Sequence, residues 1–161
     1  MQIRQATVAD AERICEIYNR EVLETTLTLD MVPRTAAAQR DWITDRSGGL
    51  AVLVAEIDGE VAGFASLSFY RDRPGYRTSV EDSIYIDRAH QGAGVGSALL
   101  TELIAVAELH GFHTLVARIV GPQEASVALH KRCGFEMVGI EREVGRKFSR
   151  WHDVALMQRL L

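Results

Sequence analysis

The stretch from Glu81 to Leu100, EDSIYIDRAHQGAGVGSALL, constrains the fold of this chain more than any other. It begins with Ile84-Tyr85-Ile86, the β-branched and aromatic residues that strands favour. A glycine-rich segment follows, and apolar residues then recur at helical spacing from Leu99 to Ala107. A strand, a glycine loop and the first turn of a helix form an anion-binding arrangement. The unpaired N–H groups of the turn and the positive end of the helix dipole both favour a phosphate.

The spacing of the glycines limits which phosphate ligand this loop could bind. The P-loop of nucleoside triphosphatases requires a lysine directly after its last glycine. No lysine follows the glycines of Gln91-Gly92-Ala93-Gly94-Val95-Gly96, so this loop is not a P-loop. A dinucleotide fingerprint has Gly-x-Gly-x-x-Gly directly after a strand, whereas the order here is Gly-x-Gly-x-Gly. For the loop taken alone, a glycine-rich turn that caps an ordinary helix is the alternative.

Composition indicates one globular domain over residues 1–161 and excludes several classes of function. Hydrophobic residues make up 47% of the 161 residues, enough for a sizeable core. The net charge of -4 argues against a nucleic-acid partner. The five histidines form no metal-ligand pattern with cysteines or carboxylates, so we expect no metal.

The N-terminal residues and the cysteines predict a soluble, cytoplasmic protein without a membrane partner. Residues 1–14 contain no apolar signal core, and no run approaches transmembrane length. Cys15 and Cys133 lie far apart in the sequence and are expected as buried thiols in a reducing compartment rather than as a disulfide.

The pattern along the chain predicts a mixed α/β order with a central sheet covered on both faces. Strands are expected over residues 2–6, 50–57, 60–69, 80–86, 114–120, 135–142 and 151–160. Helices are expected from the cap Thr7 to Val22, over 35–46, from the glycine loop to His110, and from Pro122 to Arg132. Residues 25–33 read as a loop or spacer, Asp58-Gly59 as a hairpin turn, and residues 70–78 as a basic, aromatic loop.

Taken with the rest of the chain, the loop resembles that of the GCN5-related N-acetyltransferases (GNAT), in which Gln/Arg-x-x-Gly-x-Gly/Ala grips the pyrophosphate of acetyl-CoA. Further stretches resemble the branch of phosphinothricin and methionine sulfoximine acetyltransferases. They are Ile17-Tyr18-Asn19 with Thr25-Thr26, residues 78–86, Ser126-x-x-Leu129-His130-x-x-x-Gly134-Phe135, and Gly145-Arg146-Lys147 with residues 151–154.

The resemblance implies both a fold and an activity. The implied fold is a mixed, mostly antiparallel sheet of about seven strands flanked by about four helices. The implied activity is transfer of acetyl from acetyl-CoA to the amine of a small amino acid or analogue, such as methionine sulfoximine or phosphinothricin, by direct attack in a ternary complex. It also implies a homodimer.

Glu81 is the candidate general base. An amine with a pKa of about 8 to about 10.4 holds its proton at neutral pH, so a base assists its attack. Glu81 lies in a strand that otherwise heads into the core, where partial desolvation would raise the pKa of its carboxyl. The resemblance implies the same role, often through a water; a surface carboxylate is the alternative. Asp82 is expected on the opposite face of the strand and is the less favoured base.

His130 is the candidate acid for the departing thiolate. It stands where many members of the family have a tyrosine, and the phosphinothricin-like branch also has histidine there. A protonated histidine can donate a proton to sulfur. The alternative is that His130 packs against the pantetheine and does not act as a general acid. The resemblance further implies that backbone N–H groups around Ile84, Tyr85 and Ile86 hold the thioester, where a bulge parts the fourth strand from the fifth.

The remaining site residues also follow from the resemblance. The expected acetyl-CoA contacts are Gln91, Gly92, Ala93, Gly94, Val95, Gly96, Ser97, Gln123, Ser126 and Arg132. Gln123 replaces the asparagine usual in the family, and a solvated helix face is the alternative for Ser126 and Arg132. The expected acceptor contacts are Arg73, Gly75, Tyr76, Arg77, Lys147 and Trp151. Arginines bind carboxylates or phosphinates in bidentate fashion, but a solvated loop is the alternative for the arginines and core packing for Trp151.

Two other functions stay open. An acetyltransferase for protein N-termini or lysines would need an open, acidic groove, whereas the arginine-rich loop favours a small anion. A CoA-binding sensor without catalysis is disfavoured by the presence of Glu81 and His130. Neither cysteine stands at a plausible nucleophile position, which favours direct attack over an acetylated enzyme.

Overall fold

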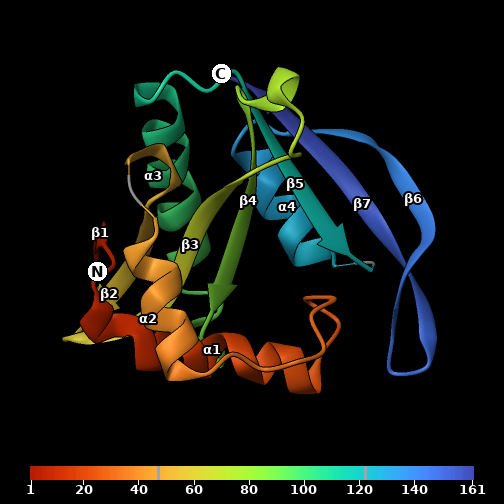
Figure 1. Cartoon of the computed structure of the whole chain (residues 1–161). Coiled ribbons are helices and arrows are strands. Elements are labelled where there is room, and N and C mark those ends of the chain that lie inside the picture. The colour runs from red at the N-terminus through yellow and green to blue at the C-terminus, as the bar shows by residue number, and fades with distance from the viewer. Residues whose placement is uncertain (47, 122) are drawn as a thin grey trace.

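The computed structural model describes residues 1–46, 48–121 and 123–161, and over these ranges seven strands form one sheet in the order β1-β2-β3-β4-β5-β7-β6 (Figure 1). The strands are β1 (Gln2–Gln5), β2 (Val52–Ile57), β3 (Glu60–Phe69), β4 (Ser79–Ile86), β5 (Thr114–Val120), β6 (Glu136–Lys147) and β7 (Arg150–Leu160). β4 and β5 pair in parallel, and the other neighbours pair antiparallel. The expected mixed, mostly antiparallel sheet is confirmed.

Four α-helices of the described ranges cover the sheet on its two faces. They are α1 (Ala11–Glu24), α2 (Ala36–Thr44), α3 (Val95–Leu109) and α4 (Glu124–Arg132). One apolar cluster packs α1 and α2 against the sheet, and a second packs α3 and α4 against the other face. Short 3-10 turns lie at Val8–Asp10, Gly48–Leu50, Pro74–Tyr76 and Arg88–His90. The start that we expected for the last helix, Pro122, lies outside the described residues.

Strand β6 is longer than its sequence pattern predicts, running to Lys147 rather than to residue 142. Its register against β7 shifts twice, between Met137 and Gly139 and between Glu141 and Gly145. Each shift interrupts the alternation of inward and outward side chains. A pattern with period two therefore could not identify the second half of the strand.

The alternation along β4 assigns its side chains to the two faces of the sheet. Val80 and Ile84 pack into the cluster of α3 and α4, whereas Tyr85 packs with Tyr18 of α1. Because successive residues of a strand point to opposite faces, Asp82 belongs to the α3/α4 face and Glu81 to the α1/α2 face.

β4 and β5 diverge after the first three residues of each strand. They pair only from Ser79↔Thr114 to Glu81↔Val116, among the residues described for these strands, and then diverge (Figure 1). The expected bulge is not found against β3, because the β3–β4 ladder is regular from Gly63↔Ile86 to Phe69↔Val80. The strands separate because β5 stays paired with β7 along its whole length and turns away with it as the sheet twists.

The end of β4 packs closely against Gly63 of β3, where there is no room for a side chain. A Cβ at this position would lie 2.8 Å from Cδ1 of Ile86 and 2.9 Å from the carbonyl oxygen of Tyr85. We therefore expect Gly63→Ala to lower the free energy of unfolding by about 1–3 kcal/mol, as overpacking does, when measured by urea denaturation. Gly139→Ala is the matched control in a strand, because a Cβ there meets nothing within 4 Å. Equal stability of the two variants would contradict this account.

Candidate active site

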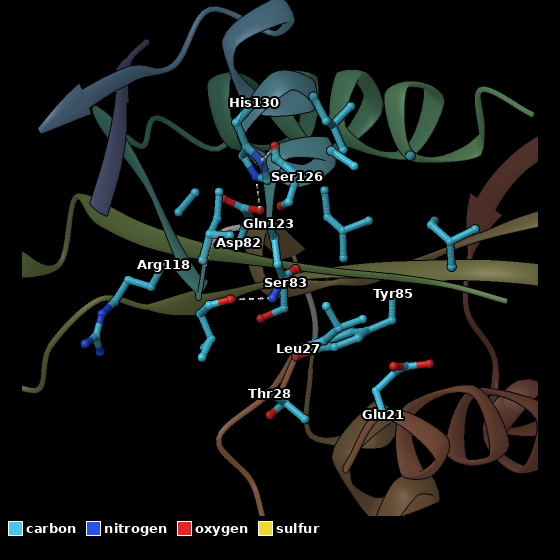
Figure 2. A pocket seen from close by; sticks show the side chains of 18 of the residues that line it. Glu21, Leu27, Thr28, Asp82, Ser83, Tyr85, Arg118, Gln123, Ser126 and His130 are labelled. Carbon is cyan, nitrogen blue, oxygen red and sulfur yellow. Dashed lines mark hydrogen bonds and ion pairs between the residues drawn. The ribbon is translucent and has the colours of Figure 1, made fainter. Parts of the chain in front are cut away.

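A cavity of about 1000 Å³ occupies the space where β4 and β5 diverge. Its walls come from segments far apart in the sequence: the end of α1 with the loop after it, the second half of β4, the glycine loop, β5 and α4. Figure 2 shows Glu21, Leu27 and Thr28 on one side of β4 and His130 and Ser126 on the other. The cavity therefore reaches both faces of the sheet through the gap between the strands.

The glycine loop forms the mouth of the cavity at the start of α3. Gly92 and Gly94 have φ of 77° and 80°, a left-handed conformation that favours glycine. Gly94 is the N-cap residue of α3, so the N–H groups of Val95, Gly96 and Ser97 have no partner within the helix. With the dipole of α3 behind them, these groups form a site for an anion such as a pyrophosphate. Of the predicted loop contacts, Ala93 is not part of the cavity wall.

Glu81 lines the cavity and belongs to the last β4–β5 pair, Glu81↔Val116. Its carboxyl is partly buried, and this burial raises its pKa above the ordinary value; the nearby Arg118 acts against the rise, and the charges of Asp82 and Glu141 add to it. A carboxylate with a raised pKa, open to a cavity, is suited to accept a proton from an amine.

His130 and Asp82 form a buried pair on the opposite face of β4 (Figure 2). Nε2 of His130 lies 3.0 Å from Oδ2 of Asp82, and the two side chains are 5% and 3% exposed. Nδ1 of His130 lies 2.7 Å from the carbonyl oxygen of Ser126, one turn back on α4. The Phe135 ring packs edge-on against the imidazole.

Two opposing effects set the pKa of His130. Burial acts to lower this pKa, but the hydrogen bond and charge of Asp82, together with the Ser126 carbonyl, outweigh burial and raise it above the ordinary value. The expected position of Asp82 on the opposite face from Glu81 agrees with the structure. Its pairing with His130 was missed, because the two residues are 48 positions apart and no local pattern connects them.

The three predicted contacts on or before α4, namely Gln123, Ser126 and Arg132, all line the cavity. The amide of Gln123 donates to the Val120 carbonyl and so ties the start of α4 to the end of β5. Ile84, Tyr85 and Ile86, which follow the last β4–β5 pair, also line the cavity. Because alternate residues of a strand direct their N–H groups to opposite neighbours, some of these donors face the side that β5 has left.

The end of the cavity beneath α1 is walled by Tyr18 and the loop of residues 27–34. Lys147, predicted to contact the acceptor, lies behind this loop instead: its buried Nζ donates to the carbonyl oxygens of Thr28 at 2.8 Å and Glu21 at 3.4 Å. Burial lowers the pKa of Lys147, and the nearby carboxylates of Asp30 and Glu21 act against this. Lys147 therefore holds the wall in place rather than forming it.

The other predicted acceptor contacts lie outside the cavity of this chain. Arg73, Gly75, Tyr76 and Arg77 occupy an exposed loop, and Trp151 is 59% exposed on β7. The paired segment of β4 and β5 stands between that loop and the gap, which the sequence could not show. The arginines that do line the cavity are Arg34, Arg118 and Arg132.

The described residues contain neither a metal-binding cluster nor a membrane-spanning helix. No group of three or more His, Cys, Asp or Glu side chains within them is arranged to hold a metal ion. Within the same ranges, no helix has both the length and the apolar character needed to cross a membrane.

Comparison with known proteins agrees with this geometry. The model of the acetyltransferase (GNAT) domain matches residues 3–156. The chain belongs to the GNAT acetyltransferase family. It is 41% identical over 158 residues to an L-methionine sulfoximine/L-methionine sulfone acetyltransferase of Pseudomonas aeruginosa, a match that covers 97% of this chain and 92% of the relative.

Two solved GNAT structures superpose closely on the chain. A phosphinothricin acetyltransferase from Sinorhizobium meliloti, in complex with acetyl-CoA, has a TM-score of 0.92 at 39% identity and covers 99% of this chain and 88% of its own. A ribosomal-protein-alanine N-acetyltransferase from Brucella melitensis has a TM-score of 0.97 at 39% identity and covers 100% of both chains.

The cavity of this GNAT chain fits acetyl-CoA as a substrate. The N–H groups at the start of α3 suit its pyrophosphate, and the gap between β4 and β5 offers backbone donors along β4 for the thioester end. Both features arise from this chain's own residues.

The raised pKa of Glu81 has a consequence for stability. A carboxyl whose pKa is raised on folding binds its proton more tightly in the folded state, so its contribution to stability falls as the pH rises from 4.5, its ordinary value, through the folded pKa. We expect Glu81→Gln to be at least as stable as the parent at pH 8, with the difference vanishing near pH 4, as measured by urea denaturation. Glu60→Gln, at an exposed carboxylate, is the control. A clear loss of stability at pH 8 would show that Glu81 supports the fold.

Proposed function

We propose that this enzyme transfers the acetyl group of acetyl-CoA to the amine of a small amino acid or amino-acid analogue, with methionine sulfoximine and phosphinothricin as the first candidates. The observation that carries the proposal is the position of Glu81, half-buried at the gap and in the same cavity as the glycine loop. The names of the relatives from P. aeruginosa and S. meliloti support the substrate class. The cytoplasm is the proposed location, in keeping with the free thiols Cys15 and Cys133.

The proposed reaction divides its tasks between the two faces of β4. Glu81 takes a proton from the ammonium group, directly or through a water, and the free amine attacks the thioester carbon. Backbone N–H groups of β4 that face the gap stabilise the negative charge on the carbonyl oxygen. His130 gives a proton to the departing sulfur. Among the described residues that line the cavity there is no cysteine, which supports direct attack.

The charges at the α1 end of the cavity suit a zwitterion. Arg34 and Arg118 supply positive charge, while Glu81 and Asp30 supply negative charge. Arg34 stacks on the ring of Tyr18, with its guanidinium carbon 4.2 Å from the ring centroid. Arg118 of β5 is paired at 2.5 Å with Glu141 of β6, the strand beyond β7 in the sheet. An acceptor with both an amine and an acid group finds a partner for each within this space.

A protein N-terminus is the second candidate acceptor. The B. melitensis structure, whose name refers to a ribosomal protein, superposes on the whole chain. Against this candidate stands the wall formed by Leu27, Thr28 and Leu29, which line the same cavity as Glu81 and which we expect to limit the space for a peptide.

A thiol-release assay with acetyl-CoA tests the function. The acceptor panel contains methionine sulfoximine, methionine sulfone, phosphinothricin, the standard amino acids, polyamines and N-terminal peptides. We expect turnover on the amino-acid analogues, and a fall in kcat of about 10²–10⁴-fold in Glu81→Gln, the range for loss of a general base. Acetyl-CoA binding, followed by calorimetry, should be retained, and Glu60→Gln should match the parent.

Other outcomes of this assay would redirect the proposal. Turnover on peptides alone would assign the enzyme to protein acetylation. Binding of acetyl-CoA without turnover on any amine would favour a sensor. Full activity of the Glu81→Gln variant would show that Glu81 is not the general base.

We also propose that the enzyme is a homodimer. Exposed apolar residues gather on the β6–β7 hairpin: Val138, Ile140, Val144, Phe148 and Trp151, each more than half exposed. Such a set on one hairpin is typical of an interface. A second copy seated there would also account for an arginine-rich loop that lies outside the cavity of its own chain.

Analytical ultracentrifugation tests the dimer. We expect a dimer for the parent chain and a monomer for Ile140→Glu, because a carboxylate buried in an apolar interface is costly to desolvate. Leu109→Glu is the control, since Leu109 is 82% exposed at the end of α3, away from the hairpin. A monomeric parent chain at micromolar concentration would contradict the proposal.

A further inference from the structure

We propose that Asp82 is a positioning residue for His130: it keeps the imidazole charged and oriented, so that the Asp82–His130 pair, rather than the histidine alone, holds the proton destined for the departing thiolate. This inference rests on the proposed acetyl transfer. It gives a role to Asp82, which the sequence predicts to be a less favoured general base than its neighbour Glu81.

The hydrogen bonds of His130 determine how many protons the pair holds. A carbonyl oxygen can only accept, so Nδ1, which lies 2.7 Å from the Ser126 carbonyl, carries a hydrogen. Nε2 faces Oδ2 of Asp82 at 3.0 Å. Two lone pairs would repel one another at that distance, so a second proton lies between these atoms. Because an imidazole holds a proton more tightly than a carboxylate does, the pair is an imidazolium with a carboxylate.

Among the groups that surround His130, Asp82 is the one that stabilises the positive charge of its imidazolium. The ring of His130 contacts Phe135, the Ser126 carbonyl and Asp82. Lys131 and Arg132 follow it on α4, and within the described part of the chain neither makes a hydrogen bond or ion pair with the ring. An imidazole this deeply buried would otherwise be neutral at pH 7, because burial disfavours its charged form.

The pair is also placed to deliver its proton. Asp82 and His130 both line the cavity, on the α3/α4 face that also carries the glycine loop. Oδ1 of Asp82 is buried and has no hydrogen-bond partner in the described structure. Within the described residues, His130 is therefore the hydrogen-bond partner of this carboxylate.

The proton count closes over one turnover. The bond between nitrogen and the acetyl carbon forms, the carbon–sulfur bond breaks, and its electron pair stays on sulfur. The proton on Nε2 of His130 moves to that sulfur and gives the thiol of CoA. The ammonium substrate releases two protons in becoming an amide. One reloads the pair, and the other leaves through Glu81 to solvent.

A double-mutant cycle with a pH profile tests the inference. The variants are Asp82→Asn, His130→Gln and the double variant, and kcat is measured at saturating substrates from pH 6 to pH 10. We expect Asp82→Asn to lower kcat at pH 8 by at least about tenfold, a modest share of a general acid's effect. The fall of kcat at high pH should begin at least about one pH unit earlier than in the parent, since the imidazolium is no longer held by a carboxylate. KM for acetyl-CoA should change by less than about threefold.

The cycle separates action through His130 from a structural role. If Asp82 acts through His130, the double variant is no slower than His130→Gln alone. Multiplied losses in the double variant, or an unshifted pH profile in Asp82→Asn, would overturn the inference. Glu60→Gln serves as the carboxylate control.

NMR titration of His130 gives a readout that needs no acceptor and no turnover. His130→Gln identifies its resonance among the five histidines of the chain. We expect His130 of the parent to stay protonated above the ordinary pKa of a histidine, and to lose this in Asp82→Asn. If Asp82→Asn does not fold, the parent titration decides: a His130 that is neutral at pH 6 overturns the inference. Absence of acetyl transfer to every amine, with His130 still protonated at pH 7, would instead refute the proposed function and leave the pair intact.

Discussion

The divergence of β4 from β5 beyond the Glu81–Val116 pair is the constraint on which the site depends. It exists because β4 keeps its ladder with β3 while β5 keeps its ladder with β7, and the twist of the sheet carries the two halves apart. In most sheets such a gap would leave costly unpaired backbone groups. Here those groups border a cavity, where a substrate can satisfy them.

The gap also explains why two adjacent carboxylates can differ in role. Glu81 and Asp82 point to opposite faces of one strand, so the sheet itself lies between them. Glu81 is partly desolvated and lies near Arg118, whereas Asp82 pairs with His130, a buried residue of α4. The two proton transfers of the proposed reaction are thereby kept apart, although their carboxylates belong to neighbouring residues.

Local sequence signals predicted most of the fold and part of the site. The glycine loop, α3 and the strands with clear alternation could be located because each depends on contacts between residues close in sequence. The second half of β6 could not, because two register shifts break its period. The Asp82–His130 pair and the position of Lys147 depend on contacts across 48 and more than 100 residues, respectively. The acceptor arginines Arg73 and Arg77 lie outside the cavity of their own chain for a related reason: whether a loop reaches a gap depends on how far the flanking strands stay paired.

Lys147 joins three segments that are remote along the chain: the end of α1, the loop that contains Thr28, and the β6–β7 hairpin. The wall over the substrate amine is thus supported from the hairpin that also carries the exposed apolar residues. Substitutions in the loop of residues 27–34 can reshape the acceptor space while Glu81, His130 and the glycine loop stay untouched. A family built in this way can acquire new acceptors by changing one wall, with the parts that handle acetyl-CoA and protons left as they are.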